Sequence, residues 1–217
     1  MALLDPSWPN DPRNFKKHYY DRTWLRKLAR VFVIGSSPIW LTVRVRGLVN
    51  VPISGSLVVS SNHVSNWDPI VMDFALPRHP VWMAKEAAFT HWFTDWAVRT
   101  LGGFEVKRGQ SDQWALRYAQ HVLEQGRVLA MFAEGTRSKS GQLKKGKTGP
   151  ARLATNTGSP ILPTALWGSP HIAKPLLKHS EGFVAFGRPI VPQPNETIEH
   201  LTNRLMYTIA AMLPADA

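Results

Sequence analysis

Hydrophobic and polar positions along the chain follow the two periods that distinguish strands from helices. Leu41–Arg46 alternates with period two, as a strand does, and Val128–Ala133 is a continuous apolar run of the length expected for a strand covered on both faces. Apolar residues at helical spacing lie between and after these segments. Strands alternating with helices predict an α/β fold: a single domain with a mixed, mostly parallel sheet flanked by helices.

The other elements are predicted from shorter apolar runs and from their boundary residues. Asp68 begins a helix with Pro69 at its first position, and Ser111 is expected to cap a helix over Asp112–Gln125 that Gly126 ends. Further strands are expected at Ser56–Ser60, Val81–Ala84, Phe104–Val106, Ile161–Leu166 and Phe183–Phe186, and further helices at His91–Leu101, Pro150–Asn156 and Glu196–Leu213.

The N-terminal part of the chain has a different pattern. Phe15–Ile34 places an aromatic and aliphatic stripe beside a basic face, which predicts an amphipathic helix that either lies in a lipid interface or packs on the domain. Residues 1–40 are therefore expected to be a membrane-docking segment and residues 41–217 the folded domain. Val31–Leu41 is too short and too interrupted to span a bilayer, and no secretory signal is expected because no basic leader precedes an apolar run.

The amino-acid composition limits the kinds of binding partner and the kinds of site that the chain can have. Lysine and arginine total 26 against 15 acidic residues, so a net charge of +11 favours an anionic partner such as nucleic acid, an anionic bilayer or an acidic substrate. The absence of cysteine excludes disulfides, thiolate metal sites and a cysteine nucleophile. The histidines lack metal-ligand spacing, so no metal site is expected.

The segment SNHVSNWD places His63 and Asp68 five residues apart, directly after a predicted buried strand. On a helix this spacing would separate them by about 140°, so they meet only if Val64–Trp67 forms a turn. The Asp68 carboxylate would then hold one imidazole nitrogen and leave the other free to remove a proton. The alternative is that Asp68 only caps its helix and His63 makes an ordinary loop hydrogen bond.

A second polar block, FAEGTRS, covers Phe132–Ser138 at the end of another predicted strand. Arg137 offers a fork of donors for a phosphate, and Gly135 allows close backbone approach. Glu134 is expected to orient the arginine or an acceptor hydroxyl. The block alone is weak support for any one function.

Four blocks in this order and spacing resemble the glycerolipid acyltransferase family typified by bacterial 1-acylglycerol-3-phosphate acyltransferase. The resemblance extends over roughly residues 43–188, with Ala133 where the family usually has proline. The blocks are His63 with Asp68 as H-x4-D, GGFEVKRG over Gly102–Gly109, FAEGTRS over Phe132–Ser138, and ILPTA over Ile161–Ala165.

The resemblance implies transfer of a fatty acyl group from acyl-CoA or an acyl carrier protein to the free hydroxyl of lysophosphatidic acid. No cofactor is implied beyond the acyl donor, and no acyl-enzyme forms. The protein would be peripheral or monotopic on the cytoplasmic face of an anionic membrane. The same resemblance assigns His63 as base and Asp68 as its orienting partner. It assigns acceptor binding to Lys85, Arg108, Glu134, Gly135, Thr136 and Arg137.

Several alternatives remain. Another lysophospholipid or a glycolipid is the second candidate acceptor. Gly141–Thr148 fits the literal P-loop pattern but does not directly follow a strand, so a basic solvated loop is the preferred interpretation. Nucleic-acid binding is favoured by the charge, but no recognised motif accompanies it, so no nucleic acid is expected. Trp82, Trp92 and Trp96 are expected either to line an acyl tunnel or to pack against the sheet.

Overall fold

The computed structural model describes residues 41–107, 112–138, 140–168 and 179–214, together with a few residues of the N-terminal segment. The predicted amphipathic helix over Phe15–Ile34 therefore lies largely outside the described residues. Among the described residues, no helix is both long enough and apolar enough to cross a bilayer. The described N-terminal residues are Asp11, Arg13, Trp24, Lys27, Leu28, Val31 and Gly35.

A single sheet organises the described part of the chain. Its seven strands lie in the order β1-β7-β6-β2-β5-β3-β4, and every neighbouring pair is parallel except β6 with β7. This confirms the predicted mixed, mostly parallel sheet. The strands are β1 (Leu41–Arg46), β2 (Leu57–Ser61), β3 (Pro80–Lys85), β4 (Gly103–Val106), β5 (Val128–Phe132), β6 (Ile161–Trp167) and β7 (Ser180–Phe186).

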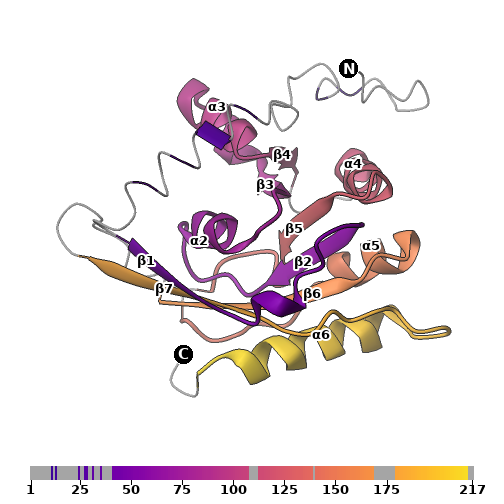
Figure 1. Ribbon diagram of the computed structural model, residues 1–217. Coiled ribbons are helices and arrows are strands. Elements are labelled where there is room, and N and C mark those ends of the chain that lie inside the picture. The colour runs from indigo at the N-terminus through magenta and orange to yellow at the C-terminus, as the bar shows by residue number, and fades with distance from the viewer. Residues whose placement is uncertain are drawn as a thin grey trace.

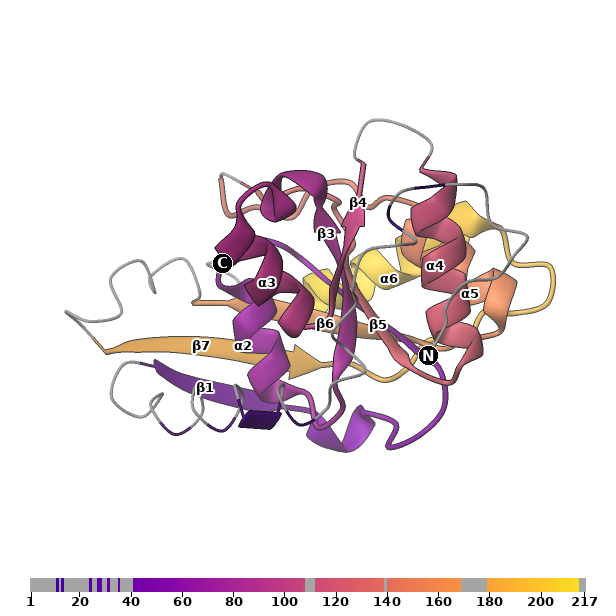
Figure 2. The ribbon, with the colours of Figure 1, turned by 90° about the horizontal axis from the view of Figure 1, so that it is seen from above.

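Helices cover both faces of the sheet. In Figure 2, α4, α5 and α6 lie on one side of the central strands, and α2 and α3 lie on the other. Figure 1 shows the same layers from the side. The helices are α2 (Asp68–Ala75), α3 (Trp92–Thr100), α4 (Gln113–Glu124), α5 (Gly149–Thr157) and α6 (Ile198–Met212), with short 3-10 helices η3 (Leu48–Asn50) and η4 (Glu86–Phe89).

Alternation along β2 explains why the sheet has two cores. Val58 packs with the face under α4, α5 and α6, whereas Leu57 and Val59 pack with the face under α2. All three side chains are fully buried. Successive strand residues point to opposite faces, so a strand covered on both sides is apolar throughout, as predicted for β5.

The start of α4 differs from the sequence prediction. The side chain of Asp112, rather than Ser111, is the N-cap, and its carboxylate accepts a hydrogen bond of 3.1 Å from the Ala115 amide. Ser111 itself lies outside the described residues. Both residue types are good caps, and the local pattern does not distinguish two adjacent candidates. Gly126 ends the helix with a positive φ, as expected.

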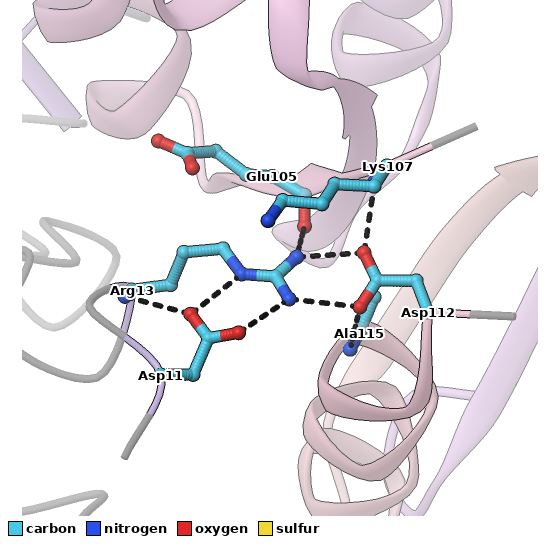
Figure 3. A network of polar contacts seen from close by, with 6 residues as sticks. All are labelled: Asp11, Arg13, Glu105, Lys107, Asp112 and Ala115. Atoms are coloured by element: carbon cyan, nitrogen blue, oxygen red, sulfur yellow. Dashed lines mark hydrogen bonds and ion pairs between the residues drawn. The ribbon is translucent and has the colours of Figure 1, made fainter. Parts of the chain in front are cut away.

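Asp112 also forms an ion pair with Arg13, and this contact joins the N-terminal segment to the domain (Figure 3). The guanidinium donates to both Asp112 oxygens at 2.6 and 2.9 Å, and to Asp11 at 2.7 and 2.9 Å. It also lies 4.3 Å from the centre of the Trp114 ring. Burial raises the pKa of Asp112, but hydrogen bonds from Arg13 and from backbone amides outweigh it and hold the pKa below its ordinary value.

Replacing Arg13 by glutamine is expected to lower the free energy of unfolding by about 3 kcal/mol, because it leaves the buried Asp112 carboxylate without its charged partner. The loss should be measured by denaturant unfolding at pH 7. Because the pKa of Asp112 is lower in the folded state, the stabilisation is complete above the ordinary value of 3.8 and is lost as the pH falls through the folded value. The difference between variant and wild type should therefore shrink in acid.

The matched control is Arg44→Gln, which breaks the solvent-exposed ion pair with Glu181. Exposed pairs contribute little because water competes for both groups. The control should leave the unfolding midpoint nearly unchanged, and an equal effect of the two substitutions would contradict a structural role for the Arg13 contact.

Candidate active site

The predicted site residues follow the carboxyl ends of neighbouring parallel strands, β2, β5 and β3. His63 lies two residues after β2, Glu134–Arg137 follows β5, and Lys85 is the last residue of β3. Parallel strands end at one edge of a sheet, so these segments are brought together although they are far apart in sequence. Arg108 follows β4 in the sequence and lies outside the described residues.

The imidazole of His63 is hydrogen-bonded to the Asp68 carboxylate. The distance from Nδ1 to Oδ2 is 2.7 Å, and Asp68 is completely buried. Since an ionised carboxylate only accepts hydrogen bonds, Nδ1 carries the hydrogen and Nε2 is the nitrogen that can accept a proton. The two side chains therefore have the geometry of a histidine base with an orienting carboxylate.

The turn between β2 and α2 makes this contact possible. The same Asp68 oxygen accepts hydrogen bonds from the amides of Val64, at 2.7 Å, and Ser65, at 2.8 Å. The Ser65 hydroxyl accepts one from the Trp67 amide at 3.2 Å. Asp68 thus stabilises the turn that precedes its own helix and also holds the His63 ring. The alternative from the sequence is wrong, because no side chain caps the start of α2 and His63 bonds to Asp68.

Two neighbours of His63 were not identified from the sequence. The Phe132 ring stacks on the imidazole, with centroids 3.7 Å apart and planes inclined by 7°. The Asn62 side chain forms two hydrogen bonds of 2.8 Å with the backbone of Leu166 on β6. Asn62 lies in the SNHVSNWD segment and Phe132 in the FAEGTRS block, which was the available signal. Together they restrict the ring and the backbone that carries it.

Glu134 connects the backbones of two loops in the structure. Its buried carboxylate accepts hydrogen bonds from two backbone amides, those of His63 at 3.0 Å and Lys144 at 3.1 Å, rather than orienting Arg137. Burial raises the pKa of Glu134 above its ordinary value, and these hydrogen bonds only partly offset the effect. The carboxylate therefore positions the backbone of the two loops.

The rest of the FAEGTRS block forms a turn whose middle residues, Thr136 and Arg137, reach solvent. Gly135 has φ of 70°, a left-handed conformation that glycine adopts without strain. Thr136 and Arg137 are exposed, and both line the adjacent cavity. The amide of Ser138 then donates to the carbonyl of His63 at 2.7 Å. The turn therefore brings Arg137 to the same cavity as His63.

The basic segment Gly141–Thr148 supports this turn. The Lys147 amide donates to the Ala133 carbonyl, and the Lys144 ammonium donates to the Arg137 carbonyl, both at 2.7 Å. The segment comes after the turn that follows β5 and not directly after a strand, as the basic-loop interpretation requires. Its lysine side chains, including Lys144, are exposed.

A cavity of about 890 Å³ lies against His63, Lys85 and Arg137. Most of its wall is apolar. Trp82 is buried and lines it, whereas Trp92 and Trp96 are exposed and do not, so neither a tunnel role nor packing on the sheet applies to those two. The apolar wall comes from α2, β3, η4 and α3, and includes Ile70, Phe74, Trp82, Ala87, Val98 and Leu101.

Close packing shapes the wall of the cavity formed by α3. A β-carbon at Gly103 would lie 2.3 Å from the Val98 side chain, so only glycine allows α3 to approach β4 this closely. Arg99 on α3 also pairs with Glu105 on β4 inside the protein. The cavity is therefore bounded by a helix that is held firmly at its C-terminal end.

Known proteins resemble this chain in both sequence and fold. Residues 42–167 match the family model described as Acyltransferase. The 1-acyl-sn-glycerol-3-phosphate acyltransferase of Streptococcus pneumoniae is 31% identical over 155 residues, which cover 68% of this chain and 57% of that protein. The enzyme of the same name from Borreliella burgdorferi is 28% identical over 136 residues, 60% of this chain and 54% of that protein.

A solved structure resembles the whole arrangement. The crystal structure of the 1-acyl-sn-glycerophosphate (LPA) acyltransferase from Thermotoga maritima superimposes with a TM-score of 0.72 at 25% identity. It covers 90% of this chain and 81% of its own. The chain spans only slightly more than half the length of the two relatives named above. Because the family match includes most of the sheet and both polar blocks, the chain belongs to the acyltransferase family.

Proposed function

We propose that this protein transfers a fatty acyl group from a thioester to the free hydroxyl of lysophosphatidic acid, giving phosphatidic acid. The observation that carries the proposal is one cavity lined by three kinds of group. His63, held by a buried carboxylate, supplies a base; Arg137 supplies a phosphate ligand; and the apolar wall suits an acyl chain. The names of the relatives support the same acceptor.

In the proposed reaction, His63 removes the proton of the acceptor hydroxyl. The resulting oxygen nucleophile attacks the thioester carbonyl, a carbon–oxygen bond forms, and the carbon–sulfur bond breaks. The proton on the imidazolium then passes to the departing thiolate, so the histidine returns to its starting state. Asp68 stabilises the imidazolium because its oxygen already accepts the Nδ1 hydrogen at 2.7 Å.

In this proposal, the exposed cations that line the cavity, Arg137 and Lys85, bind the acceptor phosphate. Arg137 is exposed and lines the cavity beside Thr136, and Lys85 lines it from the end of β3. A guanidinium donates two parallel hydrogen bonds to a phosphate, which gives orientation as well as charge. Arg108 is proposed as a second phosphate ligand from its place in the family resemblance.

The acyl donor is proposed to be acyl-CoA or an acyl carrier protein, since both present a thioester to a nucleophilic hydroxyl. We place the reaction at the cytoplasmic face of a membrane, with residues 1–40 as the docking segment. Trp24, Leu28 and Val31 have helical spacing and are exposed, which supports an interfacial role over packing on the domain.

A transfer assay on the purified protein tests the proposal. Lysophosphatidic acid, lysophosphatidylcholine, lysophosphatidylglycerol and a glycolipid acceptor should each be supplied with labelled acyl-CoA and, separately, acyl carrier protein. Lysophosphatidic acid is expected to give the highest kcat/KM because a phosphate monoester offers the most charge to Arg137. The acceptor assignment is wrong if another acceptor is clearly preferred with both donors.

His63→Ala is expected to lower kcat by about 100-fold to 10,000-fold, the range that general-base catalysis provides. The fold should be retained, because His63 belongs to neither apolar core and the Asp68 carboxylate keeps its hydrogen bonds from the Val64 and Ser65 amides. Steady-state kinetics with lysophosphatidic acid provide the measurement. The control His179→Ala removes an exposed histidine bonded to Thr42 and should leave kcat unchanged; an active His63→Ala enzyme would refute the mechanism.

Arg137→Ala should raise the KM for lysophosphatidic acid more than it lowers kcat. Loss of a charged hydrogen bond of about 1.5 to 3 kcal/mol corresponds to roughly 10-fold to 150-fold in kcat/KM. The matched control is Arg152→Ala, which removes an exposed arginine from α5 outside the cavity lining. If both variants changed KM equally, phosphate binding by Arg137 would have to be abandoned.

A further inference from the structure

The aromatic side chains on α3 are not explained by the fold or by the proposed chemistry. Trp92, Phe93 and Trp96 are 76%, 53% and 47% exposed. Their rings contact one another, with centroids 5.8 Å apart for Trp92 and Phe93 and 6.2 Å apart for Phe93 and Trp96. Large apolar groups that gather on a surface usually have a partner. We refer to these three residues as the α3 aromatic cluster.

We propose that the α3 aromatic cluster docks into the interface of an anionic lipid bilayer and thereby places the cavity against its lipid substrate. Tryptophan favours the interfacial region, where its ring is apolar and its indole N–H can still bond to water or headgroups. The inference rests on the proposed function, because that function requires a substrate drawn from a bilayer. It is separate from the role proposed for residues 1–40.

The position of α3 beside the cavity supports a bilayer as the partner. Val98 and Leu101 line the cavity, and at 100° per residue they point away from the face that carries the α3 aromatic cluster. α3 therefore lies between the apolar cavity and solvent, on the same side of the sheet as α2 (Figure 2). A lipid at a membrane surface that touches the cluster would be within one helix width of the cavity.

The C-terminal half of α3 is anchored, so the cluster is presented on a rigid support. Arg99 pairs with Asp95 at 2.8 Å and with Glu105, and it lies 4.7 Å from the centre of the Phe89 ring. Arg99 is buried, whereas the first half of the helix is exposed. A rigid presentation lowers the ordering entropy that binding would otherwise cost.

Charge also favours an anionic bilayer. Lys85 and Arg137 are exposed cations that line the cavity behind α3, and the whole chain has a net charge of +11. Anionic lipid headgroups attract such residues, by about 1 kcal/mol for each one near the surface. Apolar insertion and electrostatic attraction would thus act together on the side of the protein where the substrate binds.

Flotation with vesicles of phosphatidylglycerol and phosphatidylcholine tests the proposal on the full chain. The variant Trp92→Ala/Phe93→Ala/Trp96→Ala is expected to need at least about 10-fold more lipid for half-maximal binding, which corresponds to about 1.4 kcal/mol. The single variant Trp92→Ala should show a smaller shift in the same direction. Thermal unfolding should match that of wild type, since the three side chains are exposed.

Tyr207→Ala is the matched control. Tyr207 is 76% exposed, as Trp92 is, but it lies on α6 across the sheet. Its removal should leave vesicle binding unchanged. Equal loss in the control and the triple variant, or unchanged binding in the triple variant, would overturn the proposal. Unchanged vesicle binding together with loss of self-association would instead identify the cluster as a contact between protein chains.

Activity provides a second measurement and separates this proposal from the proposed function. The triple variant should lose transfer to lysophosphatidic acid presented in vesicles but retain transfer to a short-chain monomeric acceptor in solution. Equal losses on both forms of substrate would contradict docking. If the wild type acylated no lyso-acceptor while its vesicle binding still depended on the cluster, the proposed function would fail and the docking surface would stand.

Discussion

The hydrogen bonds made by one oxygen of Asp68 are the interaction on which the site depends. That oxygen accepts from the His63 ring and from the Val64 and Ser65 amides, at 2.7 to 2.8 Å. The carboxylate is fully buried, so these donors replace water around it. One group therefore shapes the turn after β2 and sets which ring nitrogen is available to accept a proton.

Glu134 extends this arrangement to the loop that follows β5. Its two oxygens accept hydrogen bonds from the backbone amides of His63 and Lys144, and so they connect His63 to the segment that supports Arg137. Backbone hydrogen bonds thereby connect the segments that carry the proposed base, His63, and the proposed phosphate ligand, Arg137. Flexible side chains alone would not hold these two groups in register, and small errors of position reduce catalysis strongly.

The two faces of the sheet differ in packing: one is closely packed, and the other carries the cavity. The face under α4, α5 and α6 is closely packed with apolar side chains such as Leu129 and Leu205. On the other face, α2 and α3 leave a cavity of about 890 Å³ open to His63. The packed core under α4, α5 and α6 supports the sheet, so the opposite face can keep an opening. On that face, Gly103 and the Arg99–Glu105 ion pair hold α3 close to β4, at the edge of the sheet.

The sequence by itself determined the α/β class and most element positions, because hydrophobic period and capping residues are local properties. It placed His63 and Asp68 five residues apart after a strand, but whether they meet depends on the turn between them, which the structure supplies. Through a resemblance spread over four blocks, the sequence also indicated Arg137 as a site residue and the strand ends at which the site lies. Only the tertiary structure decided the role of Glu134, the stacking of Phe132 and the exposure of Trp92 and Trp96. Those features depend on which distant segments meet across the sheet, and β2, β5 and β3 become neighbours through crossovers that no local pattern encodes.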